Sequence, residues 1–237
     1  MILQLHDLHL PLRHPFTTAN GTLTSQHNLL VSLSDGQNTG YGESPTSRSW
    51  PQFAAESARD ALEKCRSVIE SIPFEHPETF WEQIQPHLGH HPFALCALDQ
   101  AAHDLWGKRL QQPVWKLWSL DHQSLPPTNY TLGLDTDERM VAKLHEFRDW
   151  PLYKIKLGSG NDLALMQELR RHTNAVLRVD ANTGWTVEQT LSIAPALKAM
   201  GVEFIEQPLP RDDWAGMQRL HCECVLPIVA DEACQTE

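Results

Sequence analysis

Short β-rich runs recur about every 25 residues through the second half of the sequence. They are NYTLGL (129–134), YKIKL (153–157), VLRVDA (176–181), EFIEQP (203–208) and PIVADE (227–232). Stretches with amphipathic helical spacing lie between them, near 136–148, 162–173, 186–200 and 212–222. Regular alternation of strands and helices produces a parallel sheet. This half of the chain is therefore restricted to two α/β architectures, a doubly wound sheet or a (β/α)8-type barrel.

The first half of the sequence has a different pattern. An alternating run (3–12) and an apolar run (28–34) precede turn residues that lead into a short third strand near 40–44. Helical spacing then covers 51–72, 77–88 and 93–110. We predict an α+β capping domain at 1–125, with a three-stranded meander and helices, and a partial barrel domain at 126–237.

Composition excludes several classes of protein. The 237 residues carry a formal net charge of -11 without a cluster of Lys and Arg, which argues against nucleic acid as a partner. No apolar run approaches the roughly 18 residues of a membrane span. The N-terminus alternates, unlike a secretory signal. Five irregularly spaced cysteines favour reduced thiols and a cytoplasmic location. His90 and His91 are expected at the surface.

Acidic residues end three consecutive strand runs in phase. Asp180, Glu206 and Asp231 are separated by 26 and 25 residues, and Lys156 precedes Asp180 by 24. They should therefore line the C-terminal edge of the parallel strands, where barrel enzymes place their chemistry. One acid at the end of a strand is more often a helix cap, but three in phase point to a shared site. Three converging carboxylates need a counter-charge, and an all-oxygen ligand set suits Mg²⁺.

Two lysines alternate in the strand that comes before these acids. Lys154 and Lys156 are two residues apart, so their side chains share one face of the sheet. A neighbouring ammonium group and a nearby cation both disfavour the charged form of a lysine. We expect Lys156 to be partly neutral and to act as a general base, with Lys154 as its electrostatic partner. The alternative interpretation, which the residues alone leave open, is that both lysines serve only as counter-ions to the acids.

Four further residues are candidates for supporting roles. Asn182 and Glu232 follow two of the acids and could form hydrogen bonds to the ligands and the lysines. Thr131 and Gly133 end the first strand of this half and are expected to line the substrate pocket. A cation that holds a substrate carboxylate would acidify the adjacent C–H bond. The site is thus suited to removing a proton next to a carboxylate of a small molecule.

At these motifs the sequence resembles the enolase superfamily, in its muconate-lactonising subgroup. The matching strings are KIK (154–156), DAN (180–182), EQP (206–208) and ADE (230–232), together with GYGES (40–44) and ALDQAAHDLWGK (97–108). The resemblance implies a capping domain and a modified TIM-type barrel. It implies Mg²⁺ on Asp180, Glu206 and Asp231. Lys156 would be the base on one face of the substrate, and Lys154 would lie beside the substrate carboxylate.

Within that subgroup the sequence is most similar to dipeptide epimerases. The strings that carry this similarity include HPFTTANGT (14–22), TLGLDT (131–136), VDANTGWT (179–186) and EQPLP (206–210). Such enzymes invert the α-carbon of the C-terminal residue of a dipeptide such as Ala-Glu. Cycloisomerase or o-succinylbenzoate synthase activity, found in the same superfamily, is the alternative reaction.

The sequence departs from the dipeptide epimerases at two places. Relatives that act on acidic dipeptides often carry an arginine in the loop at 17–25, which here reads TTANGTLTS and favours a neutral or apolar dipeptide. The family's barrel also continues for three more βα units, with a second lysine on the opposite face of the substrate. Five strand units form an incomplete barrel with exposed edges, so we expect a homo-oligomer. A truncated and catalytically inactive chain is the alternative to an active enzyme.

Overall fold

The computed structural model describes residues 1–47 and 50–234, which form two compact units. The first unit contains residues 1–12 and 25–125, and the second contains residues 13–24 and 126–237. Each unit has its own hydrophobic core. Among the described residues, no helix has the length and apolar character that crossing a membrane requires.

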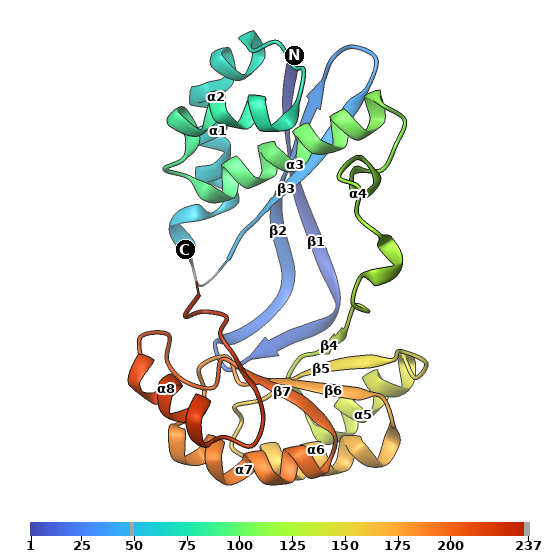
Figure 1. The fold of residues 1–237 in the computed structure, drawn as a ribbon, viewed down its shortest axis with the longest axis vertical. Coiled ribbons are helices and arrows are strands. Elements are labelled where there is room, and N and C mark those ends of the chain that lie inside the picture. Colours follow the sequence, from blue (N-terminus) through green and yellow to red (C-terminus); the bar gives the residue numbers. More distant parts are fainter. Residues whose placement is uncertain (48–49, 235–237) are drawn as a thin grey trace. The chain divides into compact units, whose positions relative to one another are not determined.

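The first unit combines a three-stranded sheet with helices (Figure 1). The sheet has the order β1-β2-β3, and β2 and β3 are antiparallel. Its elements are β1 (Ile2–Thr18), β2 (Gly21–Ser34), β3 (Thr39–Pro45), η1 (Pro51–Phe53), α1 (Ala55–Ser71), α2 (Pro77–Leu88), α3 (Pro92–Arg109), α4 (Val114–Leu117) and η2 (His122–Ser124), and the distal parts of β1 and β2 belong to the second unit.

Two glycines explain how β3 packs on α3. A methyl group added at Gly40 would lie 2.1 Å from the Ala101 carbonyl oxygen, and one at Gly42 would lie 1.9 Å from that of Ala97. The strand therefore contacts the helix backbone directly, which only glycine on the strand permits. Small alanines on α3 complete this close approach. The GYGES and ALDQAAHDLWGK strings thus have a packing function in the first unit.

The second unit is built on a parallel sheet of five strands with the order β4-β5-β6-β7-β8. Figure 1 shows α5, α6 and α7 together on one side of these strands. A doubly wound sheet would carry helices on both faces, so the strands form part of a barrel wall, and the incomplete-barrel prediction is confirmed. The elements are β4 (Tyr130–Leu132), α5 (Asp137–Glu146), β5 (Leu152–Lys156), α6 (Asp162–His172), β6 (Val176–Asp180), α7 (Val187–Ala199), β7 (Val202–Glu206), α8 (Trp214–Glu223) and β8 (Ile228–Val229).

The segment predicted as a loop at 17–25 is mostly strand. β1 extends through Thr18 and β2 begins at Gly21, which leaves a turn at residues 19–20. The hydroxyl oxygens of Thr17 and Thr22 lie 2.9 Å apart across this hairpin. Threonine is β-branched and favours extended backbone, and this preference extends both strands toward the turn.

His91 is buried, contrary to the surface position expected for it. Its ring Nδ1 accepts a hydrogen bond from the Ala94 N–H at the start of α3, and its Nε2 lies 3.1 Å from the Ser57 hydroxyl oxygen. The imidazole therefore acts as the N-cap of a helix and is enclosed by neighbouring packing. Burial lowers the pKa of His91, and the adjacent His90 lowers it further.

This burial predicts a pH-dependent stability. Because the folded state resists protonation of His91, its stabilising effect is complete above the ordinary pKa of 6.5 and is lost as pH falls below it. We expect the free energy of unfolding of His91→Gln to depend less on pH between 7.5 and 5 than that of the unmodified protein. One proton limits the difference to about 1.4 kcal/mol per pH unit.

Urea unfolding at several pH values measures this difference. His90→Gln is the matched control, because His90 is exposed and adjacent, and it should retain most of the pH dependence. Equal pH slopes for His91→Gln and the unmodified protein would show that His91 does not contribute.

Candidate active site

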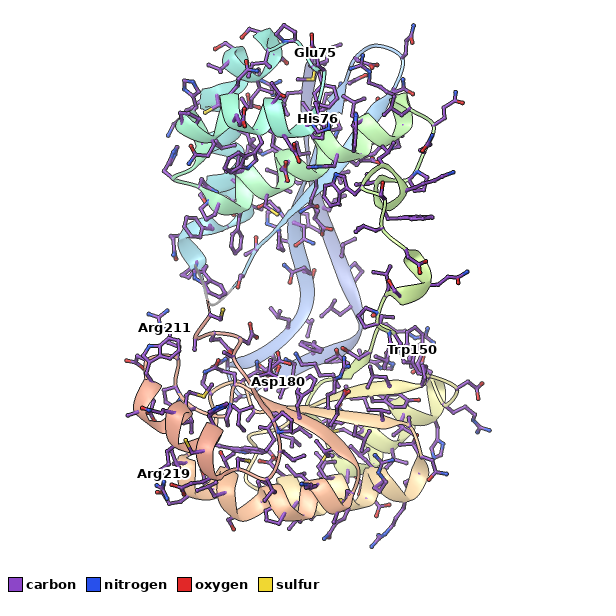
Figure 2. All side chains as sticks on the ribbon, in the orientation of Figure 1. Glu75, His76, Trp150, Asp180, Arg211 and Arg219 are labelled. Carbon is purple, nitrogen blue, oxygen red and sulfur yellow. The ribbon has the colours of Figure 1, made fainter. Side chains whose placement is uncertain are left out.

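Strand register brings the predicted polar residues to one edge of the parallel sheet. Lys156 on β5 is paired with Asp180 on β6, and Asp180 is paired with Glu206 on β7. Each is the last residue of its strand. The row lies at the C-terminal edge because parallel strands all end on the same side. Figure 2 shows Asp180 where β6 ends.

The three acids predicted as metal ligands lie together. One carboxylate oxygen from each of Asp180, Glu206 and Asp231 lies within 4.8 Å of the other two. Asp180 is fully buried, Glu206 is partly buried, and Asp231 is exposed. Asp231 was expected at the end of a strand, but β8 ends at Val229 and Asp231 follows in a turn.

The chemistry of this cluster fits a hard divalent cation. Burial raises the pKa of Glu206, and the nearby carboxylates of Asp180 and Asp231 raise it further, although Lys154 donates to Glu206 and opposes them. The site thus places three carboxylates against the two ammonium groups of Lys154 and Lys156. Close by, the buried Oδ1 of Asn182 accepts no hydrogen bond from the described residues. Carboxylate and amide oxygens are the ligands that Mg²⁺ uses.

Both lysines point toward these acids from the same face of β5. The Nζ atoms of Lys154 and Lys156 lie 2.9 and 2.6 Å from the same oxygen of Asp180. Lys154 also donates to Glu206 at 2.5 Å. Burial alone would lower the pKa of Lys154, but the hydrogen bonds to Glu206 and Asp180 raise it. The counter-ion contacts that the sequence left open are therefore present.

Neighbouring charges also determine the protonation state of Asp180. Burial alone would raise its pKa, but the ammonium groups of Lys156 and Lys154 outweigh burial and lower that pKa. Its second oxygen accepts a hydrogen bond from the Asn182 N–H at 2.9 Å. Asp180 is thus held as a carboxylate at the centre of the row, with positive groups on one side and acids on the other.

Asn182 and Glu232 contact each other. The Asn182 amide donates to the Glu232 carboxylate at 3.2 Å, which links the loop after β6 to the turn after β8. Asn182 has a φ of 42°, in the left-handed region that asparagine tolerates better than most residues. The two side chains therefore form a bridge beside the acids, and their proposed contacts to ligands and lysines remain predictions.

Thr131 and Gly133 lie beside the lysines and the hairpin, respectively. Thr131 on β4 is paired with Lys154, and its hydroxyl accepts a hydrogen bond from the Asn129 amide at 3.1 Å. A methyl group at Gly133 would come within 3.0 Å of the Thr17 nitrogen, so the β1–β2 hairpin packs closely here. Their part in substrate binding remains a prediction.

Two buried polar residues near the site were missed by the sequence analysis. Gln207 follows Glu206 directly, and its side chain holds the turn that carries Asp231. Asp162 accepts hydrogen bonds from the N–H groups of Gly158 and Ser159 and from the Trp185 indole. Gln207 lies inside the EQP string, but that string does not indicate which groups its side chain contacts, and Asp162 at the start of α6 belongs to no recognisable motif.

The Asp162 network borders a pocket of about 710 Å³ between the loop after β5 and the start of α7. Ser159, Trp185 and Gln189 are among the residues that line it. None of the candidate catalytic or metal-binding residues does so. The carboxylate row and this pocket are therefore separate features of the second unit.

Comparison with known proteins identifies the family. Residues 4–118 match the mandelate racemase / muconate lactonizing enzyme N-terminal domain, and residues 137–237 match the enolase C-terminal domain-like family. The chain is 44% identical over 238 residues to an L-Ala-D/L-amino acid epimerase of Maribacter sp., covering 100% of this chain and 69% of that protein. It is 41% identical to an L-Ala-D/L-amino acid epimerase of Flavobacterium johnsoniae, covering 100% and 70%.

Solved structures agree with these relatives. A substrate-liganded L-Ala-D/L-Glu epimerase from Bacillus subtilis superposes with a TM-score of 0.89 at 25% identity, covering 98% of this chain and 68% of that one. A dipeptide epimerase from Enterococcus faecalis, complexed with Mg and L-Leu-L-Tyr, superposes with a TM-score of 0.88 at 27% identity, covering 98% and 67%. The chain therefore belongs to the enolase superfamily, in the mandelate racemase and muconate lactonizing enzyme group, and resembles its dipeptide epimerases.

Proposed function

We propose that the protein is a Mg²⁺-dependent isomerase that inverts the α-carbon of the C-terminal residue of a dipeptide. The observation that carries this proposal is the lysine pair on β5 facing three carboxylates, in a chain of this family. Close relatives named as epimerases support the reaction class. The proposed reaction removes the proton next to the substrate carboxylate on the face of Lys156 and returns one on the opposite face, where the family resemblance places a second lysine as the proton donor.

Asp180, Glu206 and Asp231 would hold the cation. When bound, Mg²⁺ would stabilise the negative charge that develops on the substrate carboxylate as the α-proton leaves. Lys156 would accept that proton at Nζ, and Lys154 would hold the substrate carboxylate. Lys156 donates to Asp180 in this structure, so it must exchange this hydrogen bond before it can act as a base.

The composition of the hairpin tip favours a substrate whose epimerised residue has an uncharged side chain. Residues 17–26 contain no Lys, Arg, Asp, Glu or His. The basic residues that precede them, Arg13 and His14, both contact Glu146. An acidic substrate side chain would therefore find no cation from this segment. The two relatives named L-Ala-D/L-amino acid epimerases are consistent with side chains other than Glu.

Proton NMR in D₂O with Mg²⁺ tests the proposal on a panel of L-Ala-L-X dipeptides. We expect loss of the α-proton signal of the C-terminal residue and formation of L-Ala-D-X, faster for uncharged X than for Glu. Omission of Mg²⁺ should stop the exchange. Conversion of a muconate without any dipeptide exchange would instead support the cycloisomerase alternative, and the absence of exchange with every dipeptide would contradict the proposal.

A further inference from the structure

Gln207 connects the end of β7 to the turn that contains Asp231. Its side chain is completely buried. The Oε1 atom accepts hydrogen bonds from the N–H groups of Asp231 at 2.8 Å and Ala233 at 3.1 Å. The Nε2 atom donates to the Leu209 carbonyl at 2.8 Å. The amide thus forms its hydrogen bonds with backbone groups, and two of these bonds hold the Asp231 turn.

The backbone of Gln207 joins the same loops. Its N–H donates to the Val229 carbonyl at 2.8 Å, and its carbonyl accepts a hydrogen bond from the Thr183 N–H at 2.8 Å. Gln207 therefore connects the chain segments that follow β6, β7 and β8. Its φ of 32° lies in the left-handed region, which is unfavourable for a residue other than glycine. Such a conformation persists only where surrounding contacts hold it.

Asp231 needs a support of this kind because its strand does not place it. β8 contains two residues and ends at Val229, so the ladder to β7 stops before Asp231. Asp180 and Glu206 are the last residues of longer strands and are paired with each other in register. The backbone N–H of Asp231 is bonded to Gln207 instead of to a neighbouring strand.

We propose that Gln207 is a positioning residue that places Asp231 within reach of Asp180 and Glu206, and so determines the affinity of this cluster for a divalent cation. The inference rests on the proposed function only in taking the cluster as a cation site. Gln207 would contact neither the cation nor the substrate, since the Asp231 and Ala233 N–H groups and the Leu209 carbonyl occupy its amide.

Gln207→Met tests the proposal, because Met has a similar length and no amide. The N–H groups of Asp231 and Ala233 lose their acceptor, and the turn is free to move. We expect the Kd for Mg²⁺, measured by isothermal titration calorimetry on the full chain, to rise about 10–100-fold, as is typical when an outer support of a metal site is lost. An unchanged Kd in a folded Gln207→Met protein would overturn the proposal.

A matched control separates positioning from general loss of stability. Thr190 in α7 is also fully buried in the second unit, and its hydroxyl donates to the carbonyl of Thr186, the N-cap of that helix, at 2.8 Å. Thr190→Val should lower the free energy of unfolding in urea and leave the Kd for Mg²⁺ within about 2-fold. If Thr190→Val weakens Mg²⁺ binding as much as Gln207→Met does, the effect is structural and the proposal fails.

A double-mutant cycle with Asp231→Asn shows whether Gln207 acts through Asp231. In that background, Gln207→Met should change the Kd for Mg²⁺ by less than about 3-fold, because the carboxylate that it positions is gone. Full additivity of the two effects would contradict the proposal. If Gln207→Met does not unfold cooperatively, Gln207→Asn replaces it in every comparison, since it shortens the same side chain by one methylene.

These readouts are independent of the reaction. Mg²⁺ binding that depends on Gln207, without dipeptide exchange, would support the positioning role and contradict the proposed function. Dipeptide exchange together with an unchanged Kd for Mg²⁺ in Gln207→Met would support the proposed function and contradict the positioning role. Failure of the unmodified protein to bind Mg²⁺ at millimolar concentration would overturn both.

Discussion

Replacing Lys156 with Met is expected to reduce dipeptide α-proton exchange by about 10²–10⁴-fold, the usual contribution of a general base. The Nζ of Lys156 is buried beside Asp180 at the C-terminal edge of the sheet, where the substrate would bind. The Kd for Mg²⁺ should stay the same or fall, because an ammonium group that competes for Asp180 is removed. Proton NMR in D₂O and calorimetry measure the two effects.

This pair of measurements separates a base from a counter-ion. If Lys156 only neutralises Asp180, Lys156→Met would tighten Mg²⁺ binding and leave exchange intact, and the base assignment would be wrong. Lys143→Met is the matched control, because Lys143 is similarly buried in the second unit and is paired with Asp135 at 2.9 Å. It should lower stability without lowering exchange by the folded protein.

Asp180→Asn should weaken Mg²⁺ binding at least about 100-fold, more than loss of an outer support would. Asp180 is the buried member of the acid cluster and the residue that both lysines contact. Mg²⁺ at 100 times its Kd stabilises a folded protein by about 2.7 kcal/mol. We expect Asp180→Asn to lose nearly all of that stabilisation, measured as the difference between urea unfolding with Mg²⁺ and with a chelator.

Asp162→Asn is the control for Asp180→Asn. Asp162 is also a buried aspartate of the second unit, and it holds the loop after β5 and the Trp185 indole. Its replacement should lower stability both with and without Mg²⁺ and retain the stabilisation that Mg²⁺ adds. An Asp180→Asn protein that Mg²⁺ stabilises as strongly as the unmodified one would contradict the assignment of Asp180 as a ligand.

Short-range patterns in the sequence determined the parallel sheet and the row of polar residues on it. In parallel strands of equal length, equivalent residues of successive βα units lie at the same level along neighbouring strands. Within one strand, residues two apart point to the same face of the sheet. Spacing therefore placed Lys156, Asp180 and Glu206 side by side, as the register shows. The same reasoning put Lys154 on the face of Lys156.

Tertiary structure alone decided the features that depend on contacts between distant segments. The alternation of strands and helices left a barrel wall and a doubly wound sheet open, and the helices on one side of the strands decide for the barrel wall that the family resemblance implied. Asp231 lies near the other acids because Gln207 holds its turn, and His91 is buried because Ser57 and α3 enclose it. A hydrogen bond to a backbone group leaves no periodic signal in the sequence, so spacing predicted which residues share an edge but not what holds them there.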